Sequence, residues 1–258
     1  MMYKKVTISV LMMATAMLFS LEAQTQKTTE RVRLTHRFVD VTVREIERIT
    51  VPNVAIMAYR IEVLAKDDKA EVLWQITPDG LPVEEKDCFE ADVALCGQHK
   101  DSYFKSICYN KCVAFGPEFL AFDKLAKNIY FYARLGIGGT AGFSCLIFAG
   151  DLHTKTIRRL ASSWGPILHS LLSPSGQWLA LGRAGPDVEI VETKSGKTVR
   201  NIDTRELSGR TAKGSEGRLR LRPERWVGDD QILIIQEEFT DKFSHEAIGS
   251  TEKTIRIK

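Results

Sequence analysis

Short apolar runs closed by turn residues dominate the chain after residue 30. Residues 54–63 (VAIMAYRIEV) and 72–76 (VLWQI) are rich in β-branched and aromatic side chains, which favour strands. The Thr-Pro-Asp-Gly sequence at residues 77–80 is a turn signal and ends the second run. Stretches with helical periodicity are scarce, and the best candidate, residues 118–127, fits a loop followed by a strand equally well. The pattern therefore predicts an all-β fold.

One sequence phrase recurs along the second half of the chain. Residues 155–160 (KTIRRL) and 197–202 (KTVRNI) are 42 positions apart (197 − 155 = 42), and residues 253–257 (KTIRI) repeat the phrase. Units of about 40–50 residues with several short strands and a Gly or Asp turn are typical of propeller blades. We therefore predict a β-propeller-like array of about four to five irregular blades, with one strand position shared between the termini to close a ring. A β-sandwich is the alternative, because short strands bounded by turns also build sandwiches.

The clearest repeat unit resembles a known type of blade. Residues 173–182 (SPSGQWLALG) and 187–202 (DVEIVETKSGKTVRNI) are similar to a blade of the WD40, TolB or YVTN type of β-propeller. Residues 74–83 (WQITPDGLPV) resemble the outer hairpin of another blade, and the resemblance is strongest over residues 144–202. Residues 84–115 do not fit a blade, and the chain has no Trp-Asp dipeptide. The resemblance implies a fold and no activity, because such folds host many unrelated functions.

The first 23 residues have the pattern of a cleavable secretory signal peptide. Lys4 and Lys5 give a short positive segment, residues 6–21 carry no charge, and Ala23 is the small residue before a cleavage site. The apolar run is shorter than the roughly 20 residues that span a bilayer, so an uncleaved anchor is the less favoured alternative. We therefore expect a periplasmic or secreted protein that keeps no transmembrane anchor after cleavage.

A single domain is predicted after the cleavage site. Removal of residues 1–23 leaves 235 residues (258 − 23), enough for one core or one repeat array. We assign residues 24–30 to a disordered lead-in and residues 31–258 to a β-propeller-like domain with a cysteine-rich insertion at residues 84–115. The loss of two Lys and one Glu changes the formal net charge from +3 to +2. A nearly neutral, exported chain argues against nucleic acid as a partner.

Four of the five cysteines gather in one polar segment, at Cys88, Cys96, Cys108 and Cys112. In an oxidising compartment such a cluster predicts two disulfides, and the sequence leaves all three pairings open. The alternative is a zinc site, because the spacing can supply four tetrahedral ligands, Cys96, His99, Cys108 and Cys112. Export argues against zinc, since thiolates are oxidised outside the cytoplasm.

Positive charge accumulates in the last third of the chain. Between Lys194 and Arg225 there are ten Lys or Arg residues and four Asp or Glu residues, an excess of six (10 − 4 = 6). Arg218, Arg220 and Arg222 alternate with leucines, so a strand places the three arginines on one face. This face is a candidate binding strip for an anionic glycan. The simpler interpretation is a solvated strand face that protects a sheet edge.

The sequence contains no convincing motif for a cofactor, a metal or a catalytic centre, because each partial match is explained by an ordinary structural role. Residues 136–141 match G-x-G-x-x-A, but residues 143–150 have the pattern of a strand, whereas a dinucleotide site needs a helix there. The histidines form no H-x-x-x-H or H-E-x-x-H pair, and no G-x-S-x-G sequence occurs. Cys145 lies alone in an apolar run and is predicted to be a small buried side chain. The sequence therefore predicts no catalytic residue, no cofactor and no metal.

Two functions of different classes are consistent with these patterns. The first is an exported, non-catalytic binding or scaffold module of the cell envelope, which recognises another envelope or extracellular protein through propeller loops. The second is an exported enzyme, a hydrolase or lyase acting on a glycan or lactone, with its site in the central channel. A channel lined with histidines and carboxylates would favour the enzyme, and a narrow apolar channel would oppose it.

Overall fold

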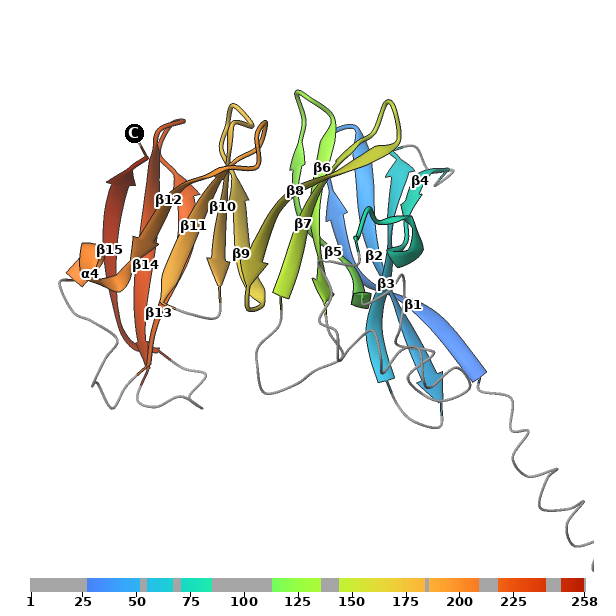
Figure 1. Cartoon of the computed structure of the whole chain (residues 1–258), viewed down its shortest axis with the longest axis horizontal. Coiled ribbons are helices and arrows are strands. Elements are labelled where there is room, and N and C mark those ends of the chain that lie inside the picture. Colours follow the sequence, from blue (N-terminus) through green and yellow to red (C-terminus); the bar gives the residue numbers. More distant parts are fainter. Residues whose placement is uncertain are drawn as a thin grey trace, which may run out of the picture.

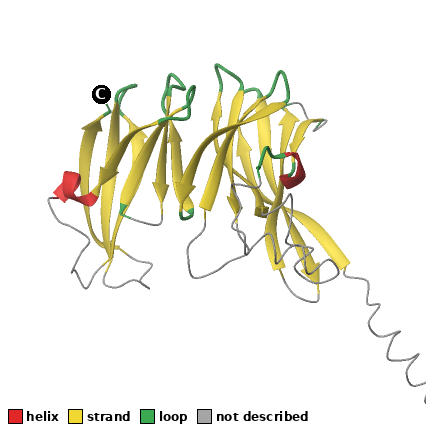
Figure 2. Ribbon diagram, viewed as in Figure 1, coloured by secondary structure: helices red, strands yellow, loops and turns green. Residues whose placement is uncertain are grey.

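The computed structural model describes residues 27–51, 55–66, 71–84, 113–135, 144–183, 186–208, 218–239 and 247–257. Most of these residues are in strands (Figure 2). The two helices of this part of the chain are short: η1 (Pro78–Gly80) and α4 (Thr204–Ser208). Among the described residues there is no helix with the length and apolar character needed to cross a membrane. The predicted all-β fold is therefore confirmed.

The strands form four antiparallel sheets, each a simple meander, which we call blades 1 to 4. Blade 1 contains β1 (Lys27–Arg37), β2 (Val41–Val51), β3 (Ala55–Ala65) and β4 (Val72–Ile76). Blade 2 contains β5 (Val113–Asp123), β6 (Asn128–Leu135), β7 (Ser144–Asp151) and β8 (Thr156–Trp164). Blade 3 contains β9 (Ile167–Leu172), β10 (Trp178–Arg183), β11 (Asp187–Glu192) and β12 (Thr198–Asp203). Blade 4 contains β13 (Arg218–Trp226), β14 (Gln231–Phe239) and β15 (Ala247–Arg256).

Successive blades stack face to face and bury three apolar cores between them. Residues such as Val43, Ile61 and Phe148 fill the core between blades 1 and 2. Leu179 and Leu181 of β10 close the next core against blade 2, while Ala180 of the same strand belongs to the core shared with blade 4. Alternate residues of one strand thus enter two different cores, which explains why the central strands are apolar on both faces.

The blades follow one another in a row, with blades 1 and 4 at opposite ends (Figure 1). This arrangement confirms the predicted propeller-like array, with four sheets in the described part of the chain. The expected strand sharing between the termini is wrong for the described residues, because β1 pairs with β2 and β15 pairs with β14. β1 begins at Lys27, so residues 27–30 of the predicted lead-in are part of a strand.

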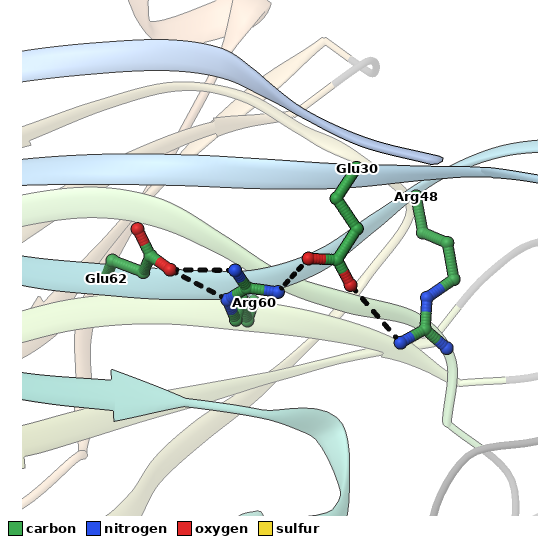
Figure 3. A network of polar contacts seen from close by, with 4 residues as sticks. All are labelled: Glu30, Arg48, Arg60 and Glu62. Carbon is green, nitrogen blue, oxygen red and sulfur yellow. Dashed lines mark hydrogen bonds and ion pairs between the residues drawn. The ribbon is translucent and has the colours of Figure 1, made fainter. Parts of the chain in front are cut away.

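The face of blade 1 that points away from blade 2 carries a network of charges (Figure 3). Arg60 of β3 donates to Glu30 of β1 at 2.5 Å and to Glu62 at 2.8 Å and 2.9 Å, and Arg48 of β2 donates to Glu30 at 3.4 Å. The hydrogen bond from Arg60 lowers the pKa of Glu30. The four side chains keep between 11% and 35% of their surface exposed, so the ion pairs balance charges that are largely removed from water.

Candidate functional site

A cavity of about 180 Å³ lies where strands of blades 1, 2 and 3 meet. Its walls come from β1, β2, β5, β6 and β9, so it lies beside the first strands of three consecutive blades. Seven polar side chains and several apolar ones share the lining. The polar residues are Arg33, His36, Glu45, Glu118, Tyr132, His169 and Ser170.

Two irregularities in strand pairing shape the cavity. The register of β1 against β2 passes from Val32 to Leu34, which leaves Arg33 as an extra residue on β1. The register of β5 against β6 passes from Phe119 to Ala121 and leaves Leu120 in the same way. An extra residue bends its strand and redirects the side chain, and such bulges are enriched beside functional sites. Arg33 and Leu120 both line the cavity.

Glu118 is the buried acceptor at the centre of the polar lining. Its carboxylate receives Arg33 Nη1 at 3.2 Å and Arg134 Nη2 at 2.8 Å. Arg134 also donates to the Tyr132 hydroxyl at 3.3 Å, and burial raises the pKa of that hydroxyl. A buried carboxylate needs compensating charge, and two guanidinium groups supply it here.

Glu45 is the second buried carboxyl group of the cavity and has a different environment. His36 Nε2 lies 3.0 Å from Glu45 Oε1, and the His36 ring packs against Phe119 with centroids 4.4 Å apart. Burial raises the pKa of Glu45, and the His36 hydrogen bond and the charge of Arg33 offset part of this effect. Burial thus favours the protonated form of Glu45. Glu118, in contrast, has two arginine partners.

His169 connects the cavity with the arginines that the sequence singled out. Burial lowers the pKa of His169, and the charges of Arg220 and Arg222 lower it further. Both arginines pair with Glu237: Arg220 at 2.7 Å and 2.9 Å, and Arg222 at 3.3 Å. The predicted anion-binding strip therefore has much of its charge neutralised at these two positions. The backbone of Arg218 belongs to β13, and its side chain is not among those that the structure describes.

The remaining sequence predictions have different outcomes. Cys88, Cys96, His99, Cys108 and Cys112 lie outside the described residues, so the disulfides and the zinc alternative stay predictions. The glycine-rich residues 136–141 also lie outside, but strand β7 follows them where a dinucleotide site needs a helix.

Cys145 is buried as a free thiol, and burial raises its pKa to about 11, so it is unreactive at neutral pH. Within the described ranges, no three His, Cys, Asp or Glu residues are grouped as metal ligands.

His36, Glu45 and Glu118 were missed at the level of sequence because they belong to three different strands. One signal was nevertheless present. Val41, Val43 and Glu45 alternate along β2, and all three are buried. A glutamate that continues an apolar alternation is placed where a charge is costly, so it marks a candidate functional position.

A second cavity, of about 360 Å³, lies between the turns of blades 2 and 3. Its polar groups largely bind one another. Thr193 Oγ1 donates to the Gly176 carbonyl at 2.7 Å, and Arg158 Nη2 donates to the Thr193 carbonyl at 2.5 Å. These bonds hold the turns together, so we take the first cavity as the candidate site.

We expect Glu45→Gln to stabilise the protein at neutral pH. The folded-state pKa of Glu45 is raised above its usual value of 4.5, so its burial favours folding only while the group is protonated. Stability is fully present below the unfolded-state pKa and is lost as the pH rises through the folded-state pKa. The Glu45→Gln variant should have no such loss, giving a gain on the order of 1 kcal/mol at pH 7.5 and almost none at pH 4.

Urea unfolding at both pH values measures this gain. Glu252→Gln is the control, since Glu252 is exposed on β15 and its replacement should change stability equally little at either pH. A stabilisation by Glu45→Gln that is the same at pH 4 and pH 7.5 would contradict the assignment.

Comparisons with known proteins give only weak likenesses. No family model matches the chain, and no curated protein matches it. Among solved structures, KlHsv2 with a loop replaced by a Gly-Ser linker is 10% identical, with a TM-score of 0.40, over 88% of this chain and 72% of that chain. An oligogalacturonate lyase in complex with manganese is 11% identical (TM-score 0.35) over 83% of this chain and 54% of that chain.

The β-propeller domain of Myceliophteria thermophila Swd1 is 8% identical, with a TM-score of 0.27, over 88% of this chain and 76% of that chain. The chain thus spans about half of the lyase and about three quarters of the other two. Likenesses of this size carry no inference about activity, and the propeller-like fold rests on the strand order and packing of the blades.

Proposed function

We propose that the chain is an exported propeller-like binding module that holds a small polar ligand in the first cavity, beside β1, β5 and β9. One observation carries the proposal: Glu45, Glu118 and His36, from three different strands, converge on a single cavity. Burying ionisable groups costs stability, and an ordinary core position would be filled by an apolar residue. Convergence of such groups in a cavity is typical of a functional site.

The dimensions of the cavity limit the ligand. A volume of about 180 Å³ is below the roughly 300–1,000 Å³ of sites for drug-sized ligands. We therefore propose a ligand of monosaccharide size, or the terminal unit of a longer chain. The apolar side chains of Leu34, Phe119 and Leu168 provide contact area, and the charged groups provide orientation.

Export and a protein partner are the parts of the proposal that rest on sequence alone. The pattern of residues 1–23 supports a periplasmic or secreted location. Recognition of an envelope or extracellular protein through loops remains part of the proposed binding role. The cysteine-rich insertion at residues 84–115 is the proposed docking element, and most of it lies outside the described residues.

An exported hydrolase or lyase is the second candidate, and one observation favours it. Glu45 and Glu118 are two buried carboxyl groups with contrasting neighbours: burial raises the pKa of Glu45, whereas two arginines hold Glu118. Pairs of carboxyl groups in contrasting environments commonly act as acid and base, and glycosidic bonds are cleaved in this way. The same cavity is lined by histidines and carboxylates, the residue types that the enzyme candidate requires at its site.

We expect Leu168→Trp to weaken ligand binding at least about tenfold by filling the cavity. The probes are D-glucose, D-glucuronate, N-acetylglucosamine and propionate, and saturation-transfer NMR measures their binding. Val199→Trp is the matched control, because Val199 is also a partly exposed apolar strand residue but lies on β12 away from the cavity. At least one probe should bind the natural protein and the control, and at least roughly tenfold more weakly the Leu168→Trp variant.

The outcomes test the cavity first and then separate the two candidate functions. Binding of no probe, or binding that Leu168→Trp leaves unchanged, overturns the cavity as the site. Cleavage of a glycan by the natural protein, lost in Glu45→Gln while binding persists, would favour the enzyme over the binding module.

A further inference from the structure

We infer that the ligand of the cavity between blades 1, 2 and 3 carries a carboxylate and that Arg33 binds this group. This inference rests on the proposed function, because it concerns the chemical class of ligand for the same cavity. It adds a specific recognition residue and a specific charge.

Arg33 is placed at the cavity by a departure from regular pairing. A regular β1 would pair each residue with β2, but Arg33 is the residue that the register omits. The bulge inserts an extra residue at the cavity wall, and the side chain of that residue lines the cavity. Arg31, two residues earlier, lies opposite Glu47 in the regular pairing of β1 with β2 and forms an ion pair with it. Neither residue lines the cavity.

The guanidinium group of Arg33 retains donors for a ligand. It has five N–H groups, and Glu118 Oε2 accepts from Nη1 at 3.2 Å. The Arg33 side chain keeps 37% of its surface exposed, whereas Glu118 keeps 9%. A buried carboxylate thus anchors one side of the guanidinium while part of its surface stays accessible. A planar guanidinium fork matches the geometry of a carboxylate and can bind it through two parallel hydrogen bonds.

The charge balance around the cavity also favours one anionic group. Arg33 and Arg134 together carry two positive charges, and Glu118, which both contact, carries one negative charge. The groups that face Glu45 are Arg33 and His36 from β1 and Glu118 from β5, and its burial favours the neutral form. His169 and Tyr132 complete the titratable lining, and both are held neutral by burial at physiological pH. Two guanidinium groups thus share one carboxylate, so Glu118 only partly balances the positive charge of Arg33, which can attract a ligand carboxylate.

The remaining walls define the rest of the ligand. Leu34, Phe119 and Leu168 offer apolar contact. The Ser170 hydroxyl already donates a hydrogen bond to the Leu120 carbonyl, at 2.7 Å. Such a mixed wall suits a ring with an apolar face and an acidic substituent, as in a hexuronate. A simple organic acid offers the carboxylate alone, and the two are separated by experiment.

Calorimetric titration with D-glucuronate, D-glucose and propionate tests the inference. D-glucuronate and D-glucose differ in the carboxylate, so the natural protein should bind D-glucuronate at least about tenfold more tightly, the size expected for one charge-assisted contact. Arg33→Met should remove this preference, and Arg31→Met should keep it. Propionate binding equal to that of D-glucuronate would assign the site to simple carboxylates, which also supports Arg33 as the recognition residue.

The outcomes separate this inference from the proposed function. Equal binding of D-glucose and D-glucuronate, blocked by Leu168→Trp, would overturn the carboxylate while the cavity stays the site. An unchanged preference in Arg33→Met would overturn Arg33. Binding of none of the three overturns the inference, and N-acetylglucosamine then tests the cavity alone. Should Arg33→Met fail to fold, Arg33→Lys keeps the charge without the fork and should weaken D-glucuronate binding several-fold.

Discussion

We expect Gly196→Ala to destabilise the protein more than any other single-methyl addition at a described glycine. Gly196 lies in the turn between β11 and β12 and has φ of +74°, a conformation that costs other residues about 1–2 kcal/mol. A Cβ atom there would lie 1.7 Å from the backbone carbonyl oxygen of Leu160 on β8. The turn of blade 3 thus packs directly on blade 2, and an alanine must push the two blades apart. We expect a loss of about 3 kcal/mol or more in the free energy of unfolding.

Urea unfolding followed by circular dichroism measures this loss, with Gly228→Ala as the matched control. Gly228 has φ of +86°, but a Cβ atom there would meet nothing within 4 Å. The control isolates the backbone cost, so it should lose only about 1–2 kcal/mol. Similar losses in the two variants would show that the close approach of blades 2 and 3 at Leu160 does not exist in solution.

We expect Phe148→Ala to cost about 3–5 kcal/mol, the usual range for a fully buried phenylalanine. Phe148 on β7 is 0% exposed and belongs to the core between blades 1 and 2. Its ring lies opposite Phe131 of β6, with centroids 5.5 Å apart and planes at 21°. The alanine leaves a cavity between two sheets that are fixed by their own hydrogen bonds, so the site cannot collapse around it.

The stability of Phe148→Ala is best measured beside that of Leu125→Ala. Leu125 is 78% exposed in the turn between β5 and β6, so its truncation should change stability by less than about 0.5 kcal/mol. A loss below about 1 kcal/mol for Phe148→Ala would contradict the face-to-face stacking of blades 1 and 2.

These two variants probe the same architectural feature in different ways. Gly196 tests a contact between a turn and a neighbouring sheet, and Phe148 tests the apolar core between sheets. Both contacts join two blades that are neighbours in chain order. In a stacked array each blade contacts its neighbours alone, so stability depends on the interfaces between successive blades.

The polar cavity shows how a stacked array can build a binding site. β1, β5 and β9 each open a blade, and their residues meet because the blades are stacked in chain order. The bulge at Arg33 then adds a charged side chain that a regular strand would direct elsewhere. Ligand recognition and blade packing therefore use the same strands, and substitutions at Glu45 or Glu118 should be tested for folding before binding.

Local sequence patterns were sufficient to predict most strands and the propeller-like way in which they are arranged. The recurring phrase at residues 155–160 and 197–202 occupies β8 and β12, the last strands of blades 2 and 3, as a repeat predicts. This was possible because alternation, turn residues and blade length are local properties. The predicted burial of Cys145 is also confirmed, since its neighbours along β7 are all apolar from residue 146 to residue 149.

Tertiary structure alone decided which polar residues meet. Arg33, Glu45 and Glu118 are up to 85 positions apart (118 − 33 = 85), and only the stacking of blades and the bulges at Arg33 and Leu120 place them in one cavity. It also decided that Arg220 and Arg222 pair with Glu237, because the register of β13 against β14 brings them opposite one another. The spacing of apolar residues and the turn residues specify the strands, whereas the register of strand pairing and the packing of blades specify which side chains meet at a site. The physical reason is that contacts between distant residues depend on the whole fold, not on any local pattern.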